Sequence, residues 1–172
     1  RAGQRKNRRQ RHHRDLPPVD LEAARTCPRT VEEAFDGVPL RPRGKKLPAR
    51  PITVPVLNGE IVTEGPFTSA ELHISRNYSD LSLARFRAIP VGGNRFDLPV
   101  ELMAPCWRSH RTGSGDVMGR LHLDRPSVTI RTEFWKPEKG RYLHPTQHRA
   151  ITHFEAARLQ GFPDDFEWCG NK

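Results

Sequence analysis

The chain has 172 residues, of which 35% are hydrophobic and 16 are prolines, and its formal net charge is +9. The length suits one domain with extensions, and the prolines argue against long helices. Without an apolar run near the roughly 20 residues that a membrane crossing needs, we expect no membrane partner. The three cysteines are widely spaced, which argues against a zinc site or a disulfide framework and fits a cytoplasmic location.

The positive charge is concentrated at one end of the chain. Seven of the 29 Lys and Arg side chains lie in residues 1–14, where there is no acid, so the remainder is nearly neutral. We predict that residues 1–20 form a disordered basic arm. Such an arm would contact a phosphate backbone with an affinity that falls as salt rises. The alternative is an accidental flank, since no initiating methionine precedes it.

The first predicted elements are short. Thr30 and Glu33 have capping-box spacing, so a short helix is expected to begin after Thr30. The proline-rich stretch 42–55 is predicted to be a loop. Residues 54–63 carry Asn58-Gly59 between apolar pairs, which predicts a β-hairpin.

The middle of the chain is predicted to contain one helix and two strands. Apolar spacing in 81–89 favours a helix, capped by Ser79 or Ser82. The alternating stretches 116–123 and 127–134 predict two strands joined by a bend at 124–126. Residues 136–140 are expected to turn. Together these elements predict an irregular α+β chain.

The last element carries a full set of helix signals. Thr152 and Glu155 fit a capping box, and good helix formers follow them. Gly161 stands where a left-handed residue ends a helix, and Pro163 prevents continuation. The helix is only about two turns long, so tertiary packing must supply most of its stability.

This last segment resembles a motif of a known family. The residues that match are Arg149, Thr152, Glu155, Ala157, Arg158, Leu159, Gln160, Gly161, Phe162, Pro163 and Asp164. They resemble the next-to-last conserved motif of bacterial DNA cytosine-5 methyltransferases. Segments 30–40, 81–99 and 119–132 resemble earlier parts of that family in the correct order, so the resemblance covers roughly residues 28–170.

The resemblance implies a fold and a set of partners. Residues 21–139 are expected to form a small, irregular, β-rich target-recognition domain. Residues 140–172 are expected to be the C-terminal segment of an incomplete α/β methyltransferase domain. The family uses S-adenosylmethionine, clamps double-stranded DNA between its two domains and flips the target cytosine out of the stack.

The catalytic residues of that family are not found in this sequence. Its nucleophile lies in a Pro-Cys-Gln context, whereas Cys106 is followed by Trp107 and is interpreted as structural. The Glu-Asn-Val acid motif and the cofactor loop are absent, and Gly113-Ser114-Gly115 is a lone Gly-x-Gly. We therefore assign no catalytic, S-adenosylmethionine-binding or metal residue here. A complementary N-terminal catalytic half is expected as a partner; the alternatives are a non-catalytic basic DNA-binding module or a decayed remnant.

Two sets of site residues are predicted. The candidate DNA-binding residues are Arg120, Arg125, Thr129 and Arg131. Thr129 matches a threonine that contacts backbone phosphate in the family, and arginine can hold phosphate or read guanine. An ordinary strand residue or a solvated strand face is the alternative for each of these four. The candidate domain-junction residues are Arg149, Thr152, Glu155 and Arg158. His144 is expected to be structural, and Phe134-Trp135 to stack a base or, more simply, to pack in the core.

Overall fold

A computed structural model describes residues 29–56, 59–109 and 112–170 and shows a mixed α+β fold. The predicted basic arm at 1–20 lies outside these residues. The helices are α1 (Val31–Phe35), α2 (Asp80–Ala88), α3 (Pro105–Ser109) and α4 (His153–Leu159). Single 3₁₀ turns are η2 (Ser69–Leu72), η3 (Arg95–Asp97), η4 (Val100–Leu102) and η5 (Pro137–Lys139). The strands are β1 (Pro51–Val56), β2 (Gly59–Glu64), β3 (Phe67–Thr68) and β4 (Glu167–Trp168), which pair as β1–β2 and β3–β4.

The predicted helix signals are confirmed at α1, α2 and α4. Thr30 and Thr152 each form a complete capping box with the glutamate three residues later. Ser79 rather than Ser82 caps α2, since its side chain accepts from the backbone N–H of Ser82. Gly161 takes a φ of 81°, as expected of a left-handed residue after α4. These local signals therefore fix where the helices begin and end.

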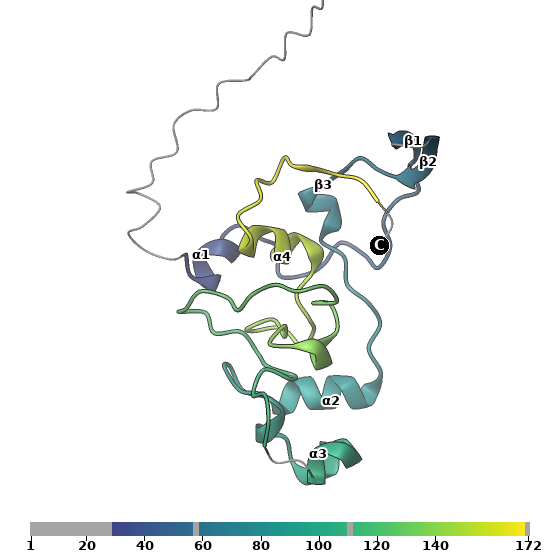
Figure 1. Cartoon of the computed structure of the whole chain (residues 1–172). Coiled ribbons are helices and arrows are strands. Elements are labelled where there is room, and N and C mark those ends of the chain that lie inside the picture. Colours follow the sequence, from purple (N-terminus) through teal and green to yellow (C-terminus); the bar gives the residue numbers. More distant parts are fainter. Residues whose placement is uncertain (1–28, 57–58, 110–111, 171–172) are drawn as a thin grey trace, which may run out of the picture.

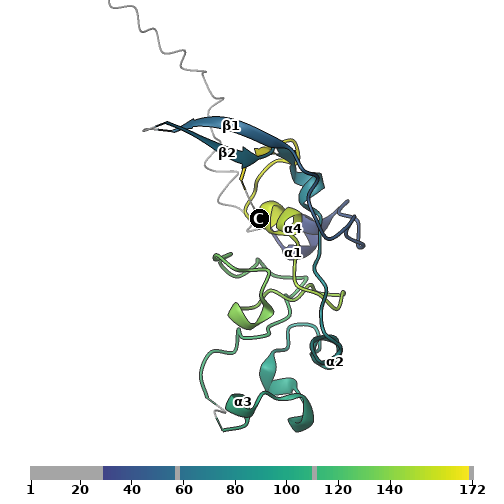
Figure 2. The same ribbon diagram turned by 90° about the vertical axis from the view of Figure 1, so that its right-hand side faces the viewer.

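The predicted hairpin is also confirmed, with a shifted turn and an earlier start. Val56 pairs with Gly59, so the connection is residues 57–58 and Gly59 already belongs to β2. β1 begins at Pro51, inside the stretch that was predicted to be a loop. The hairpin extends from one end of the molecule (Figures 1 and 2), with the side chains of Ile61 and Val62 exposed.

The prediction of two strands at 116–123 and 127–134 was wrong. The described residues there form an isolated parallel bridge, Arg120 with Leu143, and no ladder. Met118 and Glu133 have φ values of 56° and 64°, which interrupt an extended strand at either end of the region. A bend is present one residue earlier than predicted, at 123–125, and the family-based expectation of a β-rich domain reduces to two small sheets.

Helix α4 lies at the centre of the fold. It packs against α1 and η2, while α2 and α3 lie toward the end of the molecule away from the hairpin (Figures 1 and 2). One apolar cluster joins Val31 of α1, Ala156 of α4 and the side chain of Tyr142. Two others lie around Phe86 of α2 and Phe154 of α4. In the part of the chain that the structure describes, no helix is long and apolar enough to cross a membrane.

Candidate nucleic-acid interface

Two of the predicted DNA-binding residues line one groove. The groove has a volume of about 450 Å³ and lies between the segments 114–116, 128–131 and 141–142. Thr129 and Arg131 are both exposed there, and they come from a segment without regular secondary structure. Val128 and Ile130, which alternate with them, pack against the central apolar cluster. Inward and outward side chains therefore alternate along this segment, although the segment forms no sheet.

A buried tyrosine makes the backbone hydrogen bonds that a neighbouring strand would otherwise make to this segment. The Tyr142 hydroxyl donates to the Thr129 carbonyl at 3.1 Å and accepts from the Arg131 backbone N–H at 3.2 Å. The Tyr142 side chain is only 1% exposed. Because the backbone groups of 129 and 131 are both bound, the two outward side chains are presented from a fixed backbone.

The arginines around the groove have different tasks. The Arg141 guanidinium donates to the carbonyls of residues 92, 93, 115 and 120 and pairs with Asp116 at 3.5 Å. The Arg131 guanidinium donates to the Lys139 carbonyl at 3.1 Å. Arg141 thus serves the fold, whereas the Arg131 side chain is exposed.

Arg120 and Arg125 do not line this groove. Arg120 is 3% exposed, and its guanidinium donates to the carbonyls of residues 86, 89, 144 and 147. Burial lowers the pKa of Arg120. Arg125 is exposed at the bend, and its carbonyl accepts from the Val31 N–H at the start of α1. The structure therefore gives Arg120 a role inside the fold and leaves Arg125 facing solvent.

A larger groove of about 690 Å³ beside α1 is a weaker candidate for nucleic acid. Its lining includes the carboxylates of Glu32, Glu33 and Asp36, against a single arginine, Arg29. Carboxylates repel phosphate, so this excess of acids disfavours a polyanion. The smaller groove at 128–131 is consequently the better match to DNA.

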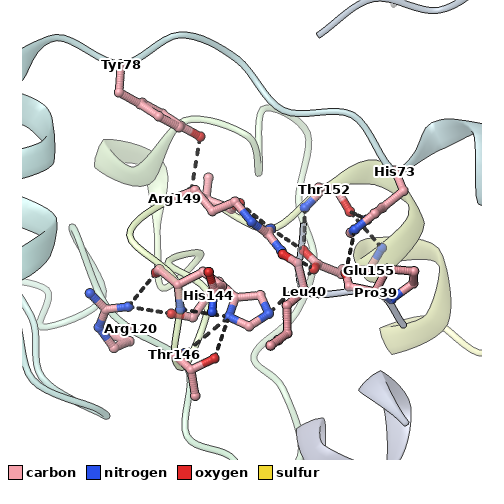
Figure 3. A network of polar contacts seen from close by, with 12 residues as sticks. Pro39, Leu40, His73, Tyr78, Arg120, His144, Thr146, Arg149, Thr152 and Glu155 are labelled. Carbon is pink, nitrogen blue, oxygen red and sulfur yellow. Dashed lines mark hydrogen bonds and ion pairs between the residues drawn. The ribbon is translucent and has the colours of Figure 1, made fainter. Parts of the chain in front are cut away.

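A buried ion pair lies at the start of α4 (Figure 3). The Arg149 guanidinium donates two parallel hydrogen bonds to the Glu155 carboxylate, at 2.7 and 2.6 Å. The side chains of Arg149 and Glu155 are 8% and 0% exposed. The same carboxylate accepts from the Thr152 N–H at 2.7 Å, so it pairs with a buried cation and caps the helix at once. Neighbouring charge and hydrogen bonds from Arg149 lower the pKa of Glu155 despite its burial.

Two neutral histidines complete this network (Figure 3). His73 Nε2 lies 2.6 Å from the Pro39 carbonyl and carries the ring proton, while its Nδ1 accepts from the Thr152 hydroxyl at 3.0 Å. His144 Nδ1 accepts from two backbone N–H groups, both at 3.1 Å, so its Nε2 proton faces Glu155 at 3.5 Å. Burial lowers the pKa of both, that of His144 to about 4.

The predicted junction residues therefore bind one another and the rest of this chain. Arg149 also donates to the Leu40 carbonyl at 3.1 Å. Arg158 pairs with Asp164 at 2.5 Å and donates to the Asp36 carbonyl beyond α1. Whether these residues also face a further domain stays a prediction. Trp135 stacks on His153 with ring centroids 5.5 Å apart, which agrees with the packing interpretation of that aromatic pair.

Tyr142, Arg141 and Tyr78 are members of these sites that the sequence alone did not indicate. The Tyr78 hydroxyl accepts from the Ala150 N–H across 72 residues, and Tyr142 and Arg141 also bind residues that are remote in sequence. The spacing of neighbouring residues in a sequence does not indicate hydrogen bonds between residues that are so far apart in the chain. Cys106, interpreted as structural, is exposed on α3 rather than packed.

Comparisons with known proteins agree with the resemblance. The profile of the C-5 cytosine-specific DNA methylases matches residues 69–172. The type II methylase M.HgiDII of Herpetosiphon aurantiacus is 35% identical over 106 residues, 61% of this chain and 30% of that protein. The type II methyltransferase M1.HphI of Haemophilus parahaemolyticus is 37% identical over 102 residues, 58% and 24% of the two chains. Mouse DNA (cytosine-5)-methyltransferase 1 is 44% identical over 91 residues, 52% and 6%. The chain thus spans less than a third of these relatives.

Proposed function

The chain belongs to the C-5 cytosine-specific DNA methylase family, and we propose that it is the part of such an enzyme that recognises DNA. In this proposal residues 21–139 form the target-recognition domain, and residues 140–172 belong to the methyltransferase domain. The observation that carries it is the groove at 128–131. There Thr129 and Arg131 face solvent from a backbone that Tyr142 holds on both sides.

The side chains of this groove suit a DNA backbone. Arg131 offers a planar set of donors that can hold a phosphate or a guanine edge. The Thr129 hydroxyl can donate to a phosphate oxygen, and Arg125 adds an exposed cation at the nearby bend. A DNA contact by Arg120 stays a prediction, but four carbonyls already occupy its guanidinium, so the proposal rests on the other three residues.

Methyl transfer itself would need groups that these residues do not supply. The family uses S-adenosylmethionine and flips the target cytosine, since its reacting atoms are buried in the base stack. The sequence contains neither Pro-Cys-Gln nor Glu-Asn-Val. The nearest described element before Gly113-Ser114-Gly115 is the helix α3, and a turn at 115–118 follows it, so it does not fit a cofactor loop. We infer that a complementary N-terminal half carries nucleophile, acid and cofactor.

The first experiment measures duplex DNA binding by the purified chain and its variants. R131Q and T129V should weaken binding, because each removes donors that face the groove while leaving the backbone contacts of Tyr142 intact. R87Q is the matched control: it removes an exposed arginine from α2, outside the groove. Wild-type affinity in both R131Q and T129V would contradict the proposed interface.

A second experiment tests the division of labour. The 172-residue chain should transfer no methyl group from S-adenosylmethionine to DNA alone, and activity should appear when a complementary N-terminal half is added. Sequence preference should follow residues 108–135 when that stretch is exchanged for a relative's. Robust methylation by the chain alone would contradict this proposal. If the chain binds DNA and no added N-terminal half produces methyltransferase activity, a non-catalytic DNA-binding module is favoured.

A further inference from the structure

A second cationic surface lies outside the groove, on the segment that follows α1. Arg41, Arg43, Lys45 and Lys46 are all exposed, and we call them the cationic strip. The sequence from residue 37 to residue 59 contains no acid. None of these side chains lines the groove at 128–131. The strip is therefore a separate concentration of positive charge.

The backbone beneath the strip is fastened to the body of the protein. The Arg43 N–H donates to the His73 carbonyl at 2.8 Å, and the Ser75 N–H donates to the Gly44 carbonyl at 2.9 Å. Gly44 thus forms a parallel bridge with Ile74, which is 5% exposed. The segment 73–79 that receives it runs along the body from η2 toward α2 (Figures 1 and 2).

The strip is also held on both sides of this bridge. Before it, the carbonyls of Pro39 and Leu40 bind His73 and Arg149 of the buried network. After it, the Leu47 side chain packs against the apolar cluster of Phe67, Leu72 and Phe154. Four cations are consequently presented from an ordered backbone, so binding a polyanion there would cost little backbone entropy.

These four charges have no acidic partner among residues 29–56, 59–109 and 112–170. The carboxylate of Glu71, in the turn η2 that precedes the bridged segment, is already bound by Arg50, with one N–O distance of 2.6 Å. Arg76 adds a further exposed cation one residue beyond Ser75, with its guanidinium 5.8 Å from the Tyr78 ring centroid. Mutual repulsion within such a set is relieved when phosphates replace the counterions.

We propose that the cationic strip binds the phosphate backbone of duplex DNA as a second contact, apart from the groove that carries Thr129 and Arg131. This rests on the proposed function, since it assumes that the chain binds duplex DNA. Lys45 and Lys46 are suited to a sequence-independent contact, because ammonium groups on flexible stems hold phosphate as point charges, and Arg41 and Arg43 can hold phosphate oxygens with their guanidinium groups. It would add affinity and salt dependence, and the groove would supply preference.

The test is the salt dependence of duplex DNA binding by the full 172-residue chain. K45Q and K46Q each remove one charge and should each reduce the slope of log affinity against log salt by about 0.9, and the double variant by about twice that. R87Q removes one charge from α2 and should leave the slope unchanged. All four proteins should melt alike, because the substituted side chains are exposed.

The outcomes separate this inference from the function on which it rests. Duplex binding with an unchanged slope in the K45Q/K46Q double variant overturns the strip alone, and would point instead to an acidic protein surface as its partner. An equal fall in the salt slope for R87Q also overturns the proposed contact, because the slope would then report the net charge of the chain and not a contact at the strip. A chain that binds no duplex DNA at any salt overturns the proposed function and the strip together.

Discussion

Replacing Glu155 by glutamine should be among the most damaging single changes in this fold. The carboxylate is fully buried and carries the two hydrogen bonds from Arg149, the Thr152 N–H bond and the 3.5 Å approach of His144. E155Q would leave the Arg149 cation buried without its counter-charge. Breaking a buried pair in this way costs about 3–5 kcal/mol, against a total stability of about 5–15 kcal/mol for a domain.

The companion variant R149M/E155Q separates the charge effect from simple loss of contacts. A methionine side chain in place of the arginine removes the unpaired cation, and the glutamine oxygen can still accept from the Thr152 N–H. The double variant should therefore be more stable than E155Q alone, although it carries one more substitution.

Urea unfolding followed by circular dichroism measures these differences. T152S is a suitable control, since serine keeps the capping hydroxyl that the Glu155 N–H and His73 use. An E155Q protein within about 1 kcal/mol of wild type would refute the reasoning, and so would a double variant as unstable as the sum of its single changes.

Three further predictions concern His144, Tyr142 and the N-terminal residues 1–14. The free energy of unfolding should fall as pH drops from about 6.5 toward 4, because His144 has a pKa of about 4 in the folded chain and about 6.5 in the unfolded chain. The full loss of stability is about 3 kcal/mol. In urea titrations at several pH values, H144Q should remove part of this pH dependence. Stability falls on acidification because the unfolded chain binds the proton of His144 more tightly than the folded chain does. A stability that rises on acidification would contradict this prediction. Y142F should lose about 1–3 kcal/mol by equilibrium unfolding and weaken duplex DNA binding, because it frees the 129–131 backbone; unchanged DNA affinity would separate Tyr142 from the interface. Deleting residues 1–14 should lower the salt slope of DNA binding, and an unchanged slope would show that the arm does not contact DNA.

The sequence predicted those parts of the fold that neighbouring residues decide. Capping boxes at Thr30 and Thr152 and the left-handed Gly161 act over three to six residues, so their signals are complete in the sequence. Thr129 and Arg131 are exposed in a segment whose apolar alternation is visible in the sequence. What failed was the pairing of the alternating segments, because a tyrosine hydroxyl at residue 142 takes the place of a partner strand.

The burial of Arg120 shows why the exposure of a side chain could not be predicted in the same way. Four carbonyls from two segments, 86–89 and 144–147, enclose its guanidinium, and only the folded chain brings the two segments together. Arg131 lies eleven residues later in an equally basic context, and yet it is exposed. Residue type alone therefore identified arginines able to bind phosphate, while the fold decided which of them are free to do so.

The contacts of α4 bear on how residues 140–172 relate to the proposed recognition domain. Thr152 binds His73, Arg149 binds the Leu40 carbonyl, and Arg158 binds the Asp36 carbonyl, so the α4 region is attached to two segments that precede residue 80, one at 36–40 and one at residue 73. Phe154 packs with Phe67 and Leu72 in one cluster. Residues on either side of residue 140 therefore contribute to one shared apolar cluster. The cationic strip is attached at the same place, because His73 binds Pro39 and Arg43 as well as Thr152. Any domain that docks against α4 would consequently act on the backbone that presents the strip.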